Sequence, residues 1–162
     1  MPGAPRSAYR CRPPVDGFIG VPAHQLSILR AMGVDVDEGP PSGARLDAEL
    51  MLDALIGYSL RGAPAGAAEE MIRLANGSDA PVLALDVPSG IGTGTAHEPS
   101  INAAATMTLD LPKEGLRSEA ARGKVGELYL ADIGVPPSLY EHPPLSLDVG
   151  PVFARGDILR LW

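Results

Sequence analysis

One short apolar run restricts the possible folds of this chain more than any other feature. Residues 81–87 read PVLALDV, and Pro88, Ser89 and Gly90 end the run at once. A continuous apolar run of this length, bounded by turn residues, is typical of a central strand buried on both faces of a parallel sheet. Parallel strands need crossover connections between them, and these are usually helices. The run therefore predicts a sheet whose strands alternate with helices.

Segments of both kinds follow in the expected order around this run. Before it, Pro64 suits the first turn of a helix, and that helix would present an apolar face made of Ala67, Met71, Ile72 and Leu74. After it, residues 104–111 and 126–133 predict two further strands, with a short helical segment at 116–121 between them. Strands that alternate with helices in this way predict an α/β fold with a mainly parallel sheet.

The residues upstream continue the same alternation. Residues 22–32 have apolar side chains at helical spacing, and Gly33 stands where a glycine commonly ends a helix. Residues 34–37 alternate valine with aspartate, which predicts a short strand with one exposed side. Residues 51–56 predict a buried strand, but leucine, methionine and alanine are also good helix formers, so a helix is the alternative there.

The first twenty residues do not follow this pattern. The segment from Met1 to Gly20 shows neither a helical period nor the alternation of a strand. We expect this segment to be disordered or foreign to the fold, and we expect one domain over residues 21–162. Its arginines have no apolar stretch behind them, so a secretory signal is not expected.

Charge, hydropathy and cysteine content exclude several classes of protein. The net charge of -7 and the pI of about 4.8 would repel a phosphate backbone, which argues against nucleic-acid binding. No apolar run reaches the roughly 18 residues that a membrane-spanning helix needs. The single cysteine, Cys11, permits neither an internal disulfide nor a thiolate metal cage, so we expect a cytoplasmic protein in a reducing compartment.

Two aspartates stand where a ligand site would lie in such a sheet. Asp53 in LDALIGYS and Asp86 in LDVPSG each follow an apolar run, one strand–helix–strand unit apart. A right-handed crossover brings both to the same edge of neighbouring strands, and ligands bind outside the carboxyl ends of such strands. Ser89 follows in a tight turn and is expected to aim its hydroxyl at the same crevice. The alternative is that both carboxylates only bond to nearby backbone amides, but a carboxylate among apolar residues needs a partner or a cation.

Other candidate groups show weaker patterns. Residues 57–62 precede the helix expected after Pro64, and glycines beside a helix start favour an anion, although an ordinary connection explains the same residues. Arg61 suits a phosphate contact and solvent exposure equally. Lys113, directly after a strand, either contacts a ligand phosphate or caps the sheet edge, and the pattern favours the cap. Three residues lack metal-ligand spacing and are expected at the surface: His24, His97 and His142.

Four separated segments agree with one known family. Read in order, they are LDALIGYSLRGAP, APVLALDVPSG, TLDLPKEGL and VGELYLADIGVPPSLY. In sequence and spacing they resemble the YjeF N-terminal domain family, the NAD(P)HX epimerases, from about Pro22 to Tyr140. The segment AHQLSILRAMGV also resembles the family helix that leads to its third strand. The resemblance implies a Rossmann-like domain of three layers with a mainly parallel sheet, often present as a homodimer.

The resemblance also implies an activity and a set of site residues. Family members are isomerases that interconvert the R and S epimers of hydrated NADH and NADPH (NADHX and NADPHX), a step of nicotinamide cofactor repair that feeds a dehydratase. By motif, Asp53 and Ser89 would help to hold one potassium ion per subunit. Asp86 would contact the damaged nicotinamide ring and serve as acid and base in the epimerisation. The residues that would line the phosphates and ribose of the hydrate are Gly57, Tyr58, Ser59, Leu60, Arg61, Gly62 and Ala63.

The chain also departs from the family pattern. It has no Asn-Asn-Gly-Gly-Asp loop, which in the family supplies a further potassium ligand and much of the phosphate cradle. The first two strands of the family fold are missing, so we expect residues 34–37 to form a strand without its native neighbour and residues 51–56 to form an exposed edge. The resemblance therefore predicts an N-terminally truncated domain, or a misassigned gene start, that is inactive or poorly folded as written.

A second function, of another class, fits the same departures. A domain of this fold without the loop would act as a ligand- or protein-binding module that performs no reaction. The presence of Asp53, Asp86 and Ser89 favours the enzyme, because a decayed site has no reason to keep all three. A plain Rossmann dehydrogenase is disfavoured, because its G-x-G-x-x-G fingerprint is absent.

Overall fold

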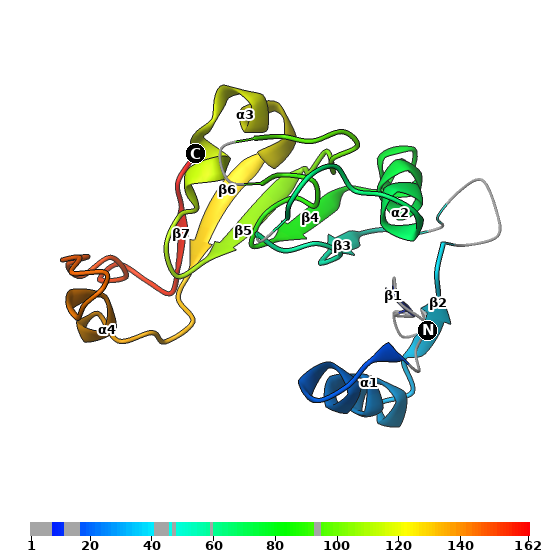
Figure 1. Ribbon diagram of the computed structural model, residues 1–162, viewed down its shortest axis with the longest axis horizontal. Coiled ribbons are helices and arrows are strands. Elements are labelled where there is room, and N and C mark those ends of the chain that lie inside the picture. The colour runs from blue at the N-terminus through cyan, green and yellow to red at the C-terminus, as the bar shows by residue number, and fades with distance from the viewer. Residues whose placement is uncertain (1–7, 12–16, 41–45, 47, 59, 93–94) are drawn as a thin grey trace, which may run out of the picture.

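Two sheets organise the chain in the computed structural model, which describes residues 8–11, 17–40, 46, 48–58, 60–92 and 95–162 (Figure 1). The larger sheet has five strands in the order β3 (Met51–Asp53), β4 (Val82–Leu85), β5 (Ala105–Leu109), β6 (Glu127–Ala131) and β7 (Ile158–Arg160). Strands β3 to β6 run parallel to one another, and β7 runs antiparallel to β6. The predicted α/β fold with a mainly parallel sheet is confirmed.

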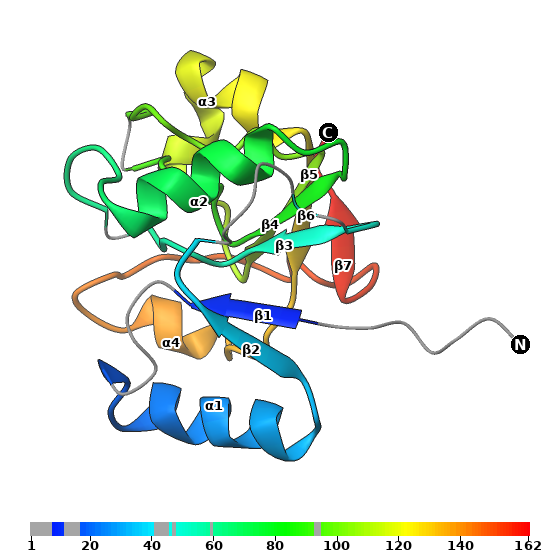
Figure 2. The same cartoon turned by 90° about the vertical axis from the view of Figure 1, so that its right-hand side faces the viewer.

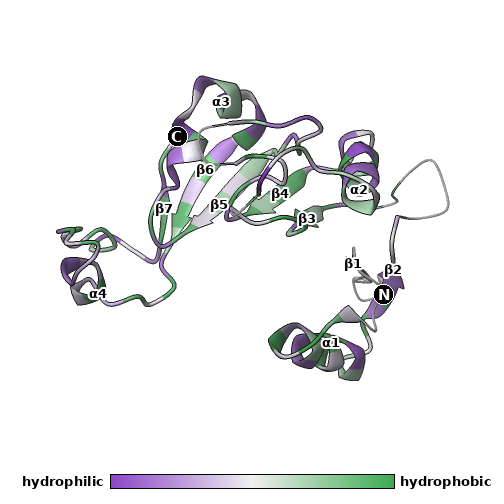
Figure 3. Ribbon diagram, viewed as in Figure 1, coloured by the Kyte–Doolittle hydropathy of each residue, from purple (hydrophilic) through white to green (hydrophobic). Residues whose placement is uncertain are grey.

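Strand β4 is the inner strand that the apolar run predicts, and all its residues are apolar (Figure 3). Val82 and Ala84 are buried on one face of the sheet. Helix α2 (Ala67–Asn76) covers this part of the face, since its Ile72 packs with Val82 and Ile101 in one buried cluster. The crossover from β3 to β4 therefore runs through a helix, as a parallel pair requires.

A second buried cluster lies over the other end of the same face. The 3-10 helix η2 (Glu114–Arg117) supplies Leu116 to it, and α3 (Glu119–Val125) supplies Val125. The helical segment expected at 116–121 is thus present as two short helices. In Figure 2, α2 and α3 lie on the same side of the strands. None of the helices in the described part of the chain has both the length and the apolar character to cross a membrane.

The opposite face of the sheet is less protected. Leu52 of β3 is 62% exposed and Leu85 of β4 is 37% exposed. A sheet covered by helices on both faces would bury both leucines. Within the described residues, the three layers that the resemblance implies are therefore only partly present.

Strand β3 is shorter than the sequence suggests. A strand was expected over residues 51–56, and the structure places one at Met51–Asp53, so the helical alternative is wrong. The strand ends there because the carboxylate of Asp53 accepts a hydrogen bond from the backbone N–H of Leu55 (3.3 Å), which turns the chain. As expected, β3 lies at the edge of the larger sheet.

A separate two-stranded sheet lies towards the N-terminus. Its strands β1 (Ala8–Cys11) and β2 (Asp35–Glu38) are parallel, and α1 (Val21–Ala31) connects them. Leu26 is the buried residue of α1. Gly33 follows the helix with a φ of 74°, a left-handed conformation that glycine adopts without strain, so the predicted helix and its end are confirmed.

The strand at Ala8–Cys11 differs from the expectation that residues 1–20 lie outside the fold. It gives the strand expected at residues 34–37 a parallel neighbour, where none was expected. Arg10 and Asp37 also form an ion pair of 3.0 Å between the two strands. A strand of four residues is too short to show a period in the sequence, and its partner is supplied by the fold. The domain boundary at residue 21 itself stays a prediction.

Two C-terminal elements were not predicted, namely α4 (Ser138–Glu141) and β7. The residues after β7 extend its pairing with β6, since the N–H of Leu161 donates to the carbonyl of Leu128 (2.8 Å). The carbonyl of Trp162 accepts from the N–H of Leu128 (3.2 Å). The indole N–H of Trp162 donates to the carbonyl of Gly126 (3.1 Å). These bonds cover the outer edge of β6.

The turn from α3 into β6 depends on a glycine. Gly126 has a φ of 62°, and a Cβ at this position would lie 2.2 Å from the carbonyl oxygen of Ala104. We expect Gly126→Ala to lower the free energy of unfolding by at least about 2 kcal/mol, because backbone strain and a backbone clash add together. Urea unfolding followed by circular dichroism measures this change. The matched control is Gly123→Ala in α3, which meets no atom within 4 Å and should stabilise the helix by about 0.5–1 kcal/mol. Equal effects of the two variants would contradict this account.

Candidate functional site

Each of the four parallel strands ends at an aspartate. Asp53 is the last residue of β3, and the residues that follow β4, β5 and β6 are Asp86, Asp110 and Asp132. Because these strands are parallel, their carboxyl ends share one edge of the sheet. The prediction that Asp53 and Asp86 lie at the same edge of neighbouring strands is confirmed. Sequence reasoning missed the other two aspartates, although TLD and LAD repeat the apolar–aspartate ending of MLD and LALD.

Asp53 and Ser89 form the most buried polar contact at this edge. Their residues are 4% and 0% exposed. The hydroxyl of Ser89 donates to Oδ1 of Asp53 (2.6 Å), and the backbone N–H of Ser89 donates to Oδ2 (2.7 Å). The same hydroxyl oxygen accepts from the N–H of Ile56 (2.9 Å). This pair therefore joins the end of β3 to the Pro-Ser-Gly turn after β4.

Burial determines the proton affinity of Asp53. It raises the pKa of this carboxyl above the ordinary value of 3.8, and the hydrogen bonds from the hydroxyl and N–H of Ser89 and from the N–H of Leu55 oppose the rise. No lysine or arginine among the described residues forms an ion pair with Asp53. In the part of the chain that the structure describes, the carboxylate thus has hydrogen-bond donors but no ion-pair partner.

The donor set around Asp53 fits a hard monovalent cation. Asp53 and Ser89 offer carboxylate and hydroxyl oxygens, which suit potassium better than a metal that prefers imidazole or thiolate. Within the described residues there is no group of three or more His, Cys, Asp or Glu side chains that would form a transition-metal site. A cation at Asp53 would compensate negative charge on this buried carboxyl, which has no ion-pair partner among the described residues.

Asp86 occupies a strained turn at the end of β4. Its φ is 68°, which is uncommon for a residue with a side chain. Its backbone N–H donates to the carbonyl of Met107 (2.8 Å), and the N–H of Val87 donates back to the carbonyl of Leu85 (2.9 Å). Strained backbone of this kind persists only where the surrounding contacts hold it. The turn directs the carboxylate of Asp86 towards the end of β5.

The carboxylate of Asp86 has three partners there, one in an ion pair and two in hydrogen bonds, and all of them contact Oδ1. They are the ammonium of Lys113 (2.8 Å), the backbone N–H of Leu109 (3.3 Å) and the hydroxyl of Thr108 (3.4 Å). Lys113 also donates to the carbonyl of Leu109 at the end of β5 (2.6 Å). Of the two interpretations of Lys113, the structure supports the cap of the sheet edge, and it adds an ion pair that the sequence did not indicate.

The two predicted site carboxylates have separate partners. Asp53 bonds to Ser89, and Asp86 bonds to residues of β5 and to Lys113. Both carboxylates accept hydrogen bonds from backbone N–H groups. The alternative interpretation, that they only bond to nearby backbone amides, therefore describes part of the structure. Two features go beyond what that alternative requires: a buried carboxyl with no lysine or arginine partner among the described residues, and a strained aspartate beside a lysine.

The predicted phosphate loop lies next to the Pro-Ser-Gly turn. Tyr58 packs against the buried cluster that includes Ile91, and the carbonyl of Leu60 lies 3.6 Å from where a Cβ on Gly92 would be. Gly62 has a φ of 80°, and Arg61 is exposed. Ser59 lies outside the described residues. The chain thus brings this loop beside the turn that holds Ser89.

The start of α2 differs in one respect from the prediction. Pro64 is buried and precedes the helix, which begins at Ala67, so the proline does not form its first turn. The histidines take no part in the site. His24 and His142 are exposed, and His97 contacts Thr95 (3.2 Å).

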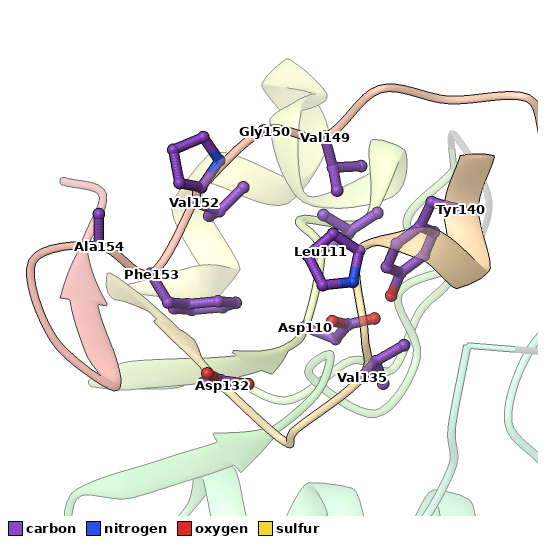
Figure 4. Close-up of a pocket in the computed structure, with 12 residues that line it drawn as sticks. Asp110, Leu111, Asp132, Val135, Tyr140, Val149, Gly150, Val152, Phe153 and Ala154 are labelled. Carbon is purple, nitrogen blue, oxygen red and sulfur yellow. The ribbon is translucent and has the colours of Figure 1, made fainter.

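A hollow of about 200 Å³ lies beyond Asp86, at the ends of β5 and β6 (Figure 4). Asp110 and Asp132 lie at its base, and the side chains of Tyr140 and Phe153 line it. Asp110 has a φ of 66° and repeats the turn of Asp86, since the N–H of Leu111 donates to the carbonyl two residues before it (2.8 Å). This hollow is separate from the Asp53–Ser89 pair.

Comparison with known proteins gives independent findings. Residues 16–115 match the family model described as YjeF-related protein N-terminus. A protein of Dehalogenimonas lykanthroporepellens named NAD(P)H-hydrate epimerase is 40% identical over 149 residues, which cover 90% of this chain and 58% of that protein. A protein of the same name from Truepera radiovictrix is 37% identical over 84% of this chain and 60% of its own length.

Two further similarities extend the comparison. The bifunctional NAD(P)H-hydrate repair enzyme of Escherichia coli is 38% identical over 54% of this chain and 17% of its own length. The crystal structure of yeast YNL200c shares the fold, with a TM-score of 0.60 and 19% identity, and the match covers 86% of this chain and 59% of the yeast chain. The chain thus spans less than two thirds of the length of each of these proteins.

We expect stability to depend on pH through Asp53 in a defined direction. In the folded protein its pKa is raised above 3.8, the ordinary value that the unfolded chain keeps. The folded state therefore binds this proton more tightly, so the contribution of Asp53 to the free energy of unfolding decreases as the pH rises from 3.8 through the raised value. Urea unfolding of wild type and Asp53→Asn, from about pH 4 to about pH 8, measures this contribution. The other titrating groups are the same in both proteins, so they cancel in the difference between the two free energies of unfolding.

The decisive quantity is how the difference in free energy of unfolding between the two proteins changes with pH. The constant cost of replacing the carboxylate does not affect this slope. A difference that does not change over this range would show that burial leaves the proton affinity of Asp53 as it is in the unfolded chain.

Proposed function

The chain belongs to the family described as YjeF-related protein N-terminus, and we propose that it acts as an epimerase of hydrated NADH and NADPH. The observation that supports this most strongly is the pair of unlike carboxylates at one sheet edge. Asp53 is buried and bonded to Ser89, whereas Asp86 is partly exposed and presents its carboxylate at the end of the neighbouring strand. Such a difference in surroundings suits one group for structure or cation binding and the other for proton transfer.

The proposed reaction needs a proton donor and a proton acceptor. Epimerisation at the hydrated carbon proceeds through ring opening, or through loss and return of water, and each route requires proton transfer at the nicotinamide ring. Asp86 is the group that we assign to this step, because its side chain is 27% exposed and is held in place by donors at Oδ1. The reacting ring would lie at the carboxyl ends of β4 and β5.

The loop from Gly57 to Ala63 would contact the phosphates and ribose of the substrate. Gly62 of this loop is left-handed and Arg61 is exposed, so the guanidinium of Arg61 is open to a phosphate. The loop leads into α2, whose N-terminus favours negative charge. These features support the proposal without testing it.

A potassium ion is the cofactor that we propose, with Asp53 and Ser89 among its ligands. When bound, it would supply positive charge beside a site that receives an anionic dinucleotide. The chain's own contribution is to hold the carboxylate and hydroxyl oxygens together, which the hydrogen bonds of 2.6 Å and 2.7 Å already do. The relatives named bifunctional NAD(P)H-hydrate repair enzymes lead us to propose a dehydratase as the functional partner.

Replacement of Asp86 tests the proposed function. We expect Asp86→Asn to slow interconversion of the two epimers at least about tenfold, since loss of a general acid and base typically costs that much or more. Chromatographic separation of the R and S forms measures the rate. The matched control is Asp132→Asn, an exposed strand-end aspartate that accepts one N–H, from Gly134 (2.7 Å), and it should leave the rate within about twofold.

Equal rates for wild type and Asp86→Asn would reject the role of Asp86. Binding of the hydrate without any interconversion by the wild-type chain would instead support the second function, a module that binds a ligand without turnover.

The proposed cation site has its own test. We expect potassium chloride to raise the Tm of the wild-type chain by about 3–6 °C relative to choline chloride at the same ionic strength, as binding at a concentration of about tenfold Kd requires. Asp53→Asn should lose this increase. The increase should also be smaller at low pH, because a raised pKa lets protons compete with the cation for Asp53. The same Tm in both salts would reject the site.

A further inference from the structure

We propose that Lys113 is a positioning residue that holds the carboxylate of Asp86 with one oxygen free for the substrate. This inference rests on the proposed function, because it concerns how the assigned acid and base is oriented. Lys113 lies 27 positions further along the chain and on another segment, so no local pattern links the two residues. The ion pair of 2.8 Å brings them together.

Lys113 reaches two strand ends with a single ammonium group. It donates to the carbonyl of Leu109 at the end of β5 (2.6 Å) and forms an ion pair with Oδ1 of Asp86 after β4 (2.8 Å). Its side chain is 23% exposed, so solvent competes only in part for these bonds. The backbone is fixed as well, because Lys113 precedes η2, its carbonyl accepts the N–H of Leu116 (3.1 Å), and Leu116 is fully buried. The side chain of Lys113 is thus fixed at both ends, by its backbone and by its ammonium group.

The bonds to Asp86 are unequally distributed between its two oxygens. Leu109 and Thr108 donate hydrogen bonds to Oδ1, and the ammonium of Lys113 forms an ion pair with the same oxygen and is the nearest of the three. Within the described residues, Oδ2 accepts no hydrogen bond. A carboxylate with one oxygen held and the other open is fixed in rotation about its Cβ–Cγ bond. Proton transfer through Oδ2 would then start from one defined orientation, and correct orientation contributes strongly to catalysis.

A purely structural role for Lys113 makes a different prediction. If the lysine only capped β5, its removal would reduce stability and leave the reaction unchanged. Lys124 is a matched control for such a role, since its side chain has the same 23% exposure and forms an ion pair with Glu98 (3.2 Å). Glu98 is 73% exposed and lies outside the proposed site, so Lys124→Met removes a comparable contact elsewhere.

Steady-state kinetics of the full chain tests the proposal. We expect Lys113→Met to lower kcat by about tenfold or more and to leave KM within about twofold, because orientation of Asp86 matters in the transition state. Lys124→Met should leave both constants unchanged. In an Asp86→Asn background, Lys113→Met should cause no further loss of kcat, since a residue that acts through Asp86 has no effect once that carboxylate is gone. Circular dichroism and Tm establish that each variant is folded.

Rescue separates positioning from loss of fold. In a chain with Cys11→Ser, which removes the single native cysteine, Lys113→Cys should be as slow as Lys113→Met. Alkylation of the new thiol with bromoethylamine restores an ammonium group on a side chain of nearly the same length. We expect this treatment to recover most of kcat, and the same treatment of the Cys11→Ser parent to have no effect.

Each of the other results overturns the proposal. An increase in KM at constant kcat would make Lys113 a substrate-binding residue. A further loss of kcat from Lys113→Met in the Asp86→Asn background would mean that it acts independently of Asp86. Unchanged kinetics of Lys113→Met, with Asp86→Asn slow, would reject the positioning role and leave the proposed function intact. An inactive wild-type chain, or equal rates for wild type and Asp86→Asn, would reject the proposed function and this role with it.

Discussion

The hydrogen bonds between Asp53 and Ser89 hold together the segments on which the candidate site depends. Because Ser89 donates to both carboxylate oxygens and accepts from Ile56, one side-chain pair connects the end of β3, the turn after β4 and the start of the loop before α2. Loss of either partner would leave a buried polar group unsatisfied, at a cost of about 1–3 kcal/mol. The contact also concentrates negative charge in the interior, where burial raises the pKa of Asp53. The same pair therefore positions the site and holds the carboxyl at which we propose that a cation binds.

The carboxyl edge of the sheet is maintained against local backbone preference. Asp86 and Asp110 both have φ values near 67°, and each turn is closed by a backbone bond to the neighbouring strand. Gly90 permits the next turn, because a Cβ there would lie 2.6 Å from Cα and Cβ of Ser100. Such strain persists only if packing elsewhere compensates for it. That packing is supplied by the two buried clusters between the helices and the sheet, one around Ile72 and the other around Leu116. The strands beneath these clusters lead directly into the strained turns.

Sequence reasoning identified the features that depend on periodicity and topology. The apolar run at β4, its crossover helix and the shared edge of Asp53 and Asp86 follow from the rules for parallel sheets, which determine where a strand end lies. They do not determine where a side chain points. The partner of Asp86 depends on a left-handed aspartate, and residue type alone does not predict that conformation. Similarly, β1 and β7 are short and gain their stability from pairing with distant residues, so neither shows a period of its own.

The negative charge at the carboxyl edge of the sheet explains why the proposal includes both a lysine and a bound cation. Four strand-end aspartates meet there on a chain with a net charge of -7, and a dinucleotide would add phosphate charges to them. Two of these carboxylates face the proposed site, and the negative charge of each is balanced in a different way. Lys113 balances Asp86 from within the chain, at 2.8 Å, whereas the partners of Asp53 among the described residues are neutral donors. The proposed potassium ion would balance Asp53 from outside the chain. In the proposed function, compensation of both carboxylates, one by a residue and the other by an ion, would favour the approach of an anionic substrate.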